Sequence, residues 1–199
     1  MNCNLSIHIR SFLVCTLLLA GCTDKDAPGI EEVATIPLQL MVNTVSGSTD
    51  TRSVVSQTGT ASGQVGEIGI CLALASDGHS AYATPEASSA LFTLSGSDVW
   101  TASRPVNLRS AQARLYAWYP AVESNLTTVD NGTARTVAIT LPASQTFDGA
   151  NATDCSQSDY LYGSASGTVG DATPITVNRD NNNPTVYLQH ALTRLHHRV

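Results

Sequence analysis

Apolar and polar residues alternate in short runs along most of this chain, which is the periodicity of strands with one buried face. The clearest run has apolar residues at every second position: Ile36, Leu38, Leu40 and Val42. Pro37 has no N–H to donate to a neighbouring strand, so we expect this strand at the edge of a sheet. The run therefore predicts an edge strand whose apolar face packs on a core.

Further strands are predicted where the same pattern returns along the chain. They cover Ile68, Ile70, Leu72 and Leu74; Leu91 to Leu94; Leu115 to Tyr119; Val137, Ile139 and Leu141; and Val186 with Leu188. Clusters of Gly, Asn, Asp and Ser separate these runs, as turns between strands require, and no long window has the helical period. Many short strands with such turns predict an all-β fold, a Greek-key β-sandwich over residues 34–199, whose strand order the spacing leaves open.

The first 21 residues have the features of a signal peptide. His8 and Arg10 precede an apolar run from Phe12 to Ala20, which is too short to span a bilayer. The run ends at Leu18 to Cys22, which resembles the lipobox of bacterial lipoproteins. That resemblance implies removal of residues 1–21 and acylation of Cys22, for instance with palmitate. The alternative is an ordinary secretory signal that contains a cysteine.

Residues 22–33 are short, charged and interrupted by Pro28 and Gly29, which predicts a flexible tether. Several acyl chains on Cys22 would hold the chain on a membrane without a transmembrane helix. The acidic residues that follow Cys22 resemble a surface-export signal of Gram-negative lipoproteins. We therefore expect the protein on the cell surface, anchored by lipid in the outer membrane.

The amino-acid composition argues against two classes of function, nucleic-acid binding and catalysis by a lysine. The chain has 10 Lys and Arg residues against 16 Asp and Glu, a net charge of −6, which disfavours nucleic acid as a partner. Lys25, in the predicted tether, is the only lysine. Catalysis by a lysine in the folded part is therefore excluded.

Two cysteines remain as a candidate disulfide if the signal peptide is removed and Cys22 carries lipid. These are Cys71 and Cys155, and an oxidising exterior would permit the bond. It would add about 4 kcal/mol in the chain-entropy treatment of a long loop. Alternatively, Cys71 packs as a small apolar residue in its strand.

No residue pattern indicates an enzyme, a metal site or a cofactor. Asp77 to Ser80 contains an acid, a base and a nucleophile, but Asp-Gly is first of all a turn signal. On one strand His190 and His196 would stand about 20 Å apart, with His197 on the opposite face, so they would not share a metal ion. We expect His190 to be a hydrogen-bonded core histidine.

Aromatic residues in two patches have two interpretations. Together and exposed they would form a sugar-stacking platform, whereas aromatic residues on strands usually pack in the core or across strands. The residues concerned are Tyr116, Trp118, Tyr119, Tyr160 and Tyr162.

Four separated patches, in this order behind a lipobox, resemble the fimbrillin family, the lipoprotein subunits of type V pili. They are Thr51-Arg52-Ser53, the run from Tyr116 to Pro120, Gln145 followed by Asp159 to Gly163, and the run from Leu188 to Leu195. The resemblance covers residues 22 to 199. It implies the first of the two transthyretin-like β-sandwich domains typical of the family, and we expect the C-terminal domain to be missing.

The resemblance also implies a function. In the family an Arg-specific protease removes the first strand outside the cell, and the next subunit fills the groove with a strand of its own. Arg52 stands at the matching cleavage position, and the run from Ile36 to Val42 is the candidate exchangeable strand. This implies a structural or adhesive subunit of a fimbria, partnered by other pilus subunits and by a ligand on a host or bacterial surface. The alternative is a glycan-binding surface lipoprotein for nutrient uptake.

Overall fold

The alternating runs form strands in a computed structural model of the chain, which describes residues 34–45, 58–59, 64–96, 98–139 and 159–191. The described strands are β1 (Ile36–Pro37), β2 (Met41–Thr44), β3 (Glu67–Leu74), β4 (Ser89–Ser95), β5 (Val99–Ala102), β6 (Asn107–Leu108), β7 (Ala113–Tyr119), β8 (Val129–Asp130), β9 (Arg135–Thr136), β10 (Leu161–Ser164), β11 (Ile175–Val177) and β12 (Thr185–His190). Two short helical segments, α1 (Pro85–Ser88) and the 3-10 turn η1 (Glu123–Asn125), lie between strands. The fold is therefore all-β, as the alternation predicts.

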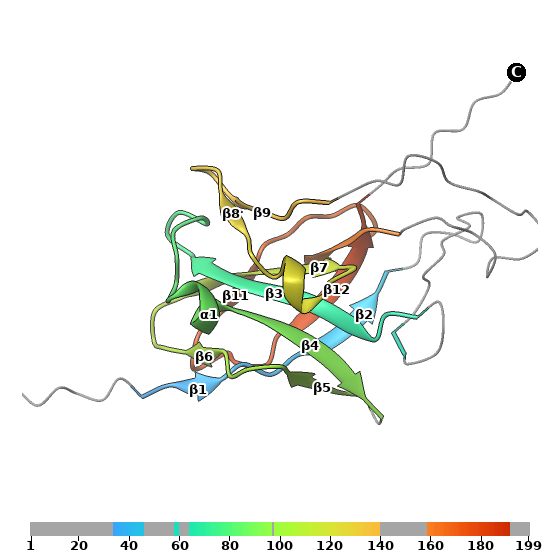
Figure 1. The fold of residues 1–199 in the computed structure, drawn as a ribbon, viewed down its shortest axis with the longest axis horizontal. Helices are drawn as coiled ribbons and strands as arrows, with labels where there is room; N and C mark the ends of the chain where they lie inside the picture. The colour runs from blue at the N-terminus through green and yellow to red at the C-terminus, as the bar shows by residue number, and fades with distance from the viewer. Residues whose placement is uncertain (1–33, 46–57, 60–63, 97, 140–158, 192–199) are drawn as a thin grey trace, which may run out of the picture. The chain divides into compact units, whose positions relative to one another are not determined.

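Most strands join one mixed sheet in the order β2-β12-β10-β7-β3-β4-β5, drawn in Figure 1. The neighbours in this sheet are antiparallel except β12 and β2, which are parallel. β10 and β11 share one edge of β7, with Leu161 opposite Tyr119 and Ile175 opposite Leu115. Two further pairs, β1 with β6 and β8 with β9, form separate two-stranded ladders.

The main core lies on one face of this sheet. It includes Val42 from β2 and Trp100 from β5, the strands at the two ends of the sheet. Side chains from opposite ends meet in one cluster only if the sheet curls around it, as twisted sheets do. The result is a nearly closed sheet within the compact unit Ala34–Val199.

A smaller cluster covers the centre of the opposite face. Cys71 and Trp118 on the sheet pack there against Ala121 and Leu126, which flank η1. Because β3 is covered on both sides, its side chains are buried at consecutive positions from Ile68 to Ala73. Pure alternation, as predicted for this strand, is therefore not seen.

Most predicted strands are present, and one is wrong. The runs around Ile70, Phe92, Ala117 and Val186 correspond to β3, β4, β7 and β12. The strand predicted over Val137, Ile139 and Leu141 does not form as such: β9 ends at Thr136, and Ile139 is 51% exposed. Val137 is half-buried against the smaller cluster, but no described strand pairs beside Ile139, and Leu141 lies outside the described residues.

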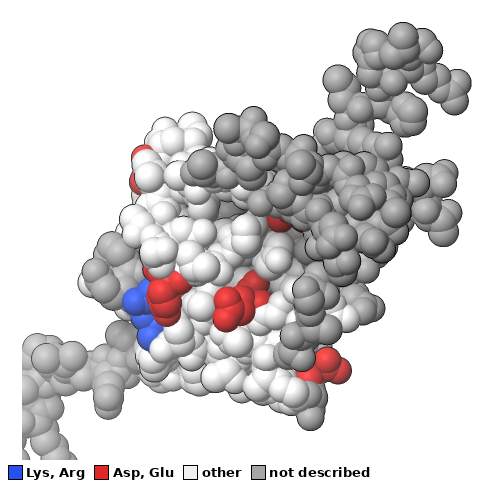
Figure 2. Space-filling view, turned by 45° about the vertical axis from the view of Figure 1, so that its right-hand side comes forward, with Lys and Arg blue, Asp and Glu red and all other residues white. Residues whose placement is uncertain are grey.

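The described surface carries few charges. Figure 2 shows one face on which scattered acidic side chains and a small basic patch interrupt a largely uncharged surface. Within the described ranges, no helix is both long enough and apolar enough to cross a membrane.

Candidate functional site

Residues 36–45, here called the closing segment, pair first with one element and then with another. Ile36 and Pro37 pair with β6, and the Leu38 N–H donates to the Val106 carbonyl at 2.8 Å. From Gln39 onward the partners change, because its N–H donates to the Asn182 carbonyl at 2.8 Å and β2 then runs beside β12. The segment thus connects the region after β5 with the opposite end of the main sheet (Figure 1).

The predicted single strand from Ile36 to Val42 is therefore wrong in detail. It is divided into β1 and β2, because the backbone changes partner between them. Ile36 is 40% exposed, since β1 has only the two-residue ladder with β6 beside it among the described strands. The edge position is as expected: β2 is the last strand of the main sheet.

Three apolar side chains fix the closing segment to the core. Leu38, Leu40 and Val42 are 5%, 6% and 7% exposed, and all three belong to the main cluster. The intervening Met41 is 50% exposed. The period-two pattern of the sequence thus identifies the buried side chains from Leu38 to Val42, but it is wrong for Ile36.

An asparagine in the turn before β12 fastens the same segment. The Asn182 side-chain amide donates to the Pro37 carbonyl at 3.0 Å, while its backbone carbonyl accepts from Gln39. No pattern in the sequence distinguished Asn182 from its neighbours. Its only signal was an asparagine-rich turn ahead of a strand.

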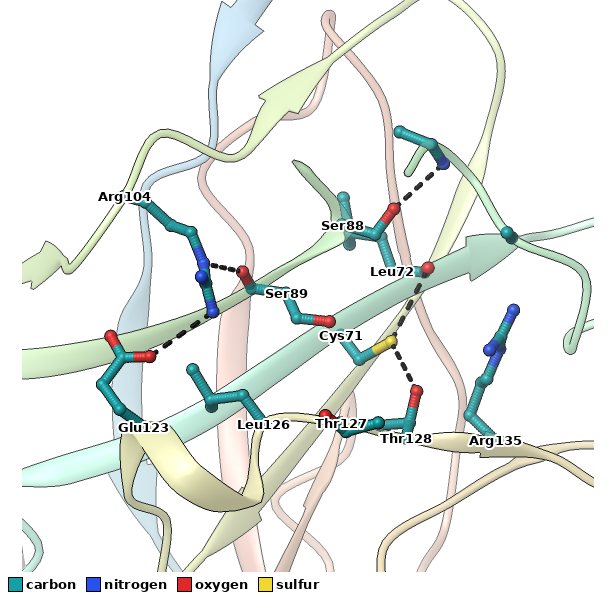
Figure 3. Close-up of a pocket in the computed structure, with 12 residues that line it drawn as sticks. Cys71, Leu72, Ser88, Ser89, Arg104, Glu123, Leu126, Thr127, Thr128 and Arg135 are labelled. Atoms are coloured by element: carbon teal, nitrogen blue, oxygen red, sulfur yellow. Dashed lines mark hydrogen bonds and ion pairs between the residues drawn. The ribbon is translucent and has the colours of Figure 1, made fainter. Parts of the chain in front are cut away.

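A pocket of about 300 Å³ opens on the outer face of β3. Figure 3 shows Arg104 and Glu123 on one side, Arg135 on the other, and Cys71 with Thr128 between them. Arg104 donates from Nε to the Ser89 carbonyl at 2.7 Å, and its Nη2 lies 3.4 Å from a Glu123 carboxylate oxygen. Sequence spacing gave no signal for this pocket, since its residues come from five separate segments.

Cys71 lies buried in the wall of this pocket, with no disulfide partner among the described residues. Its sulfur is 3.2 Å from the Thr128 hydroxyl oxygen. Cys155 lies outside the described residues, so the disulfide stays a prediction.

The turn at Asp77 to Ser80 does not have the geometry of a catalytic triad. Ser80 donates its hydroxyl hydrogen to Asp77 at 2.5 Å, and His79 Nδ1 lies 3.0 Å from an Asp130 oxygen on β8. The Ser80 hydroxyl, followed by backbone N–H groups, holds the pKa of Asp77 far below its usual range. The N–H of Gly132, with the His79 ring, lowers the pKa of Asp130. The contact between His79 and Asp130 connects the turn to the β8–β9 hairpin.

The histidines at the end of the chain are placed only in part. His190 Nδ1 lies 2.9 Å from Asp159 Oδ1, and the histidine side chain is half-buried. It is hydrogen-bonded as expected but less deeply buried than a core residue, because it ends β12. His196 and His197 lie outside the described residues, and within those residues no three His, Cys, Asp or Glu side chains are grouped to hold a metal ion.

The five aromatic side chains are buried to different degrees. Trp118 and Tyr160 are buried, and Tyr116, Tyr119 and Tyr162 are half-buried. The Tyr116 hydroxyl donates to the Gly78 carbonyl at 2.5 Å. They do not form an exposed row on one face.

Cys22 and Arg52, the expected lipidation and cleavage positions, lie outside the described residues. No protein-family model matches the chain, and no curated protein sequence matches it.

Proposed function

We propose that this chain is a fimbrillin-like surface lipoprotein, a structural or adhesive subunit of a pilus that assembles by strand exchange. It would be anchored through Cys22 to the outer membrane, and its nearly closed sheet would be a transthyretin-like sandwich with Greek-key connections. The observation that carries the proposal is the closing segment: an edge segment with three buried apolar side chains and backbone bonds to two different elements.

The buried side chains of the closing segment contribute a large part of the free energy of unfolding. Each of Leu38, Leu40 and Val42 is worth about 1.5 to 3 kcal/mol when buried, or about 5 to 9 kcal/mol together. A domain of this size has about 5 to 15 kcal/mol of net stability. A subunit that lost the segment would therefore have a strong tendency to bind a replacement.

The backbone provides the bonding positions for such a replacement. Carbonyls of Val106, Asn182, Pro184 and Leu188 accept N–H groups along the closing segment. Backbone carbonyls bond any extended peptide, whereas the pockets of Leu38, Leu40 and Val42 select apolar side chains at alternate positions. This is the usual division of affinity and specificity in strand addition.

Cleavage at Arg52 would make exchange feasible. The arginine follows β2 in the chain, so a cut there leaves the closing segment held only by non-covalent contacts. A strand from another subunit then competes for the same groove.

The test uses an Arg-specific protease on the purified chain, followed by a fluorescent peptide with the sequence of residues 34–45. We expect the cleaved protein to take up the peptide and the uncleaved protein to exclude it. A peptide with serine in place of the three buried apolar residues should not bind. Uptake without cleavage, or equal uptake of the serine peptide, contradicts the mechanism.

A matched pair of variants tests whether cleavage occurs at Arg52. Arg52→Lys keeps the charge and removes the protease site, so it should abolish both cleavage and uptake. Arg179→Lys makes the same change at an exposed arginine and should behave like the parent chain. In a mixture with a two-domain fimbrillin, only the cleaved parent should enter ladders that resist sodium dodecyl sulfate.

The alternative of a glycan-binding lipoprotein lacks such support. It requires aromatic rings exposed together, and none of the five candidate rings is exposed. Strand exchange is therefore the function that the geometry favours.

A further inference from the structure

The pocket beside β3 has a positive group without a counter-ion in contact. Of its three charged residues, Arg104 and Glu123 pair with each other. Arg135 Nε is fully shielded from solvent and has no hydrogen-bond acceptor among the described residues. Asp130 stands opposite Arg135 in the β8–β9 ladder, but its oxygens bond to His79 and the Gly132 N–H.

A buried donor on a charged group without an acceptor is unfavourable, and most such groups in proteins have a partner. Nε is too enclosed to meet a ligand atom directly, so an acceptor in the pocket would bond the outer guanidinium nitrogens of Arg135 and offset the cost by pairing its charge. Carboxylates match a guanidinium especially well, because both are planar and can form two parallel hydrogen bonds.

Hydroxyl groups that line the same pocket would complete the contacts. The Ser88 hydroxyl oxygen accepts from the Ala83 N–H at 3.0 Å, which leaves its hydrogen to donate. Thr128 lies on the other side of the pocket, beside the Cys71 thiol (Figure 3). Ser88 is 3% exposed, so a ligand that reached it would be well shielded from water.

We propose that this pocket binds the carboxylate of a small monoanionic ligand, with Arg135 as the charged anchor and hydroxyl groups as additional donors. Arg135 has no carboxylate in contact and attracts Asp130 only at longer range, so the pocket suits one negative charge, and a monocarboxylate fits it better than a phosphate dianion. A volume of about 300 Å³ is at the lower end of ligand pockets and limits the ligand to a peptide terminus or a sugar acid.

The test is a titration of the purified chain at constant ionic strength, followed by ligand-observed NMR. N-acetylglycine serves as the probe for a peptide terminus, D-glucuronate as the probe for a sugar acid, and N-acetylglycinamide as the neutral control. We expect at least one acid to bind and the amide not to bind; the acid that binds more tightly identifies the source. Absence of binding by both acids, or equal binding of the amide, overturns the proposal.

Substitutions of Arg135 test whether this residue binds the carboxylate. Arg135→Gln should weaken binding by about 10-fold or more, and Arg135→Lys should also weaken it, because lysine keeps the charge but loses the planar fork. Arg179→Gln removes an exposed arginine elsewhere and should leave binding unchanged. Unchanged affinity in both Arg135 variants would refute the assignment.

A second measurement needs no variant, so it does not depend on whether Arg135 variants fold. Cys71 lines the pocket, and mass spectrometry of its peptide reports its rate of alkylation by iodoacetamide. The bound acid should slow alkylation at Cys71, whereas the amide should not. Equal rates with a saturating acid would show that the ligand lies elsewhere.

Discussion

A single glycine, Gly69, allows an indole ring to cover one face of the central strands. Gly69 on β3 lies opposite Trp118 on β7, and a Cβ at Gly69 would be 2.3 Å from the indole ring. The glycine therefore allows the ring to lie directly on the backbone of its neighbour. This close approach, rather than a turn, explains a glycine in the middle of a buried strand.

Gly69→Ala should lower the free energy of unfolding by about 1 to 3 kcal/mol, because the indole must shift in a packed cluster. Gly96→Ala is the matched control, since a Cβ there meets no atom within 4 Å. Urea unfolding followed by far-UV circular dichroism measures both. Equal stabilities of the two variants would show that Trp118 does not rest on Gly69.

The turn at Asp77 predicts a pH dependence. A carboxyl group whose pKa is lower in the folded than in the unfolded state stabilises the fold above the unfolded value of about 3.9. That contribution is lost as the pH falls through this value towards the folded one. Since the pKa of Asp77 is lowered in the fold, first by the Ser80 hydroxyl, acid should destabilise the parent chain through this group.

Asp77→Asn should therefore reduce the loss of stability between about pH 5 and about pH 2. Asp180→Asn removes one exposed carboxylate and serves as the control for a change in net charge. Unfolding free energies across this range measure the effect. A slope in Asp77→Asn as steep as in the parent would contradict the role of this carboxylate.

At the scale of elements, the sequence predicted the strands that carry strong apolar runs, including β2 at the edge of the main sheet. β3, β4, β7 and β12 carry strong apolar runs, because they form the body of the sheet. β5, β10 and β11 are short and were not predicted as strands from alternation. They form because they pair with longer strands. That pairing depends on the whole fold, so the local sequence shows little alternation there.

The candidate sites were predictable to different degrees for the same reason. Burial of Leu38, Leu40 and Val42 follows from alternation, whereas the division into β1 and β2 depends on two distant partners, β6 and β12. The pocket with Arg104, Glu123 and Arg135 had no local pattern at all. Its residues meet only after the β8–β9 hairpin and η1 pack on the outer face of β3.

The closing segment provides a direct test of its packing. Leu40→Ala should cost about 2 to 5 kcal/mol, since Leu40 is 6% exposed and its removal leaves a cavity in the main core. Met41→Ala, at an adjacent exposed position, should change stability by no more than about 0.5 kcal/mol. Thermal unfolding compares the two. Similar losses in both variants would mean that the alternation does not reflect burial.

For the whole molecule, the two clusters share the same central strands. The two tryptophans of the chain report on them separately, because Trp100 lies in the main core and Trp118 in the outer cluster. β3 and β7 contribute side chains to both clusters, so loss of one removes the support of the other. The described unit should therefore unfold as one cooperative body.

Trp118→Phe leaves Trp100 as the fluorescent probe, and Trp100→Phe leaves Trp118. Urea unfolding of each variant, followed by fluorescence and by circular dichroism, should give coincident transitions for the two signals. Separate midpoints within either variant would show that the outer cluster opens before the main core.

The parallel pairing of β2 with β12 has one more consequence. Any strand that replaced β2 in the same register would have to run in the same direction as β12, so each molecule would accept its neighbour in only one orientation. A contact between two different surfaces that repeats without closing produces an open fibre. A thread built in this way would have a distinct head and tail.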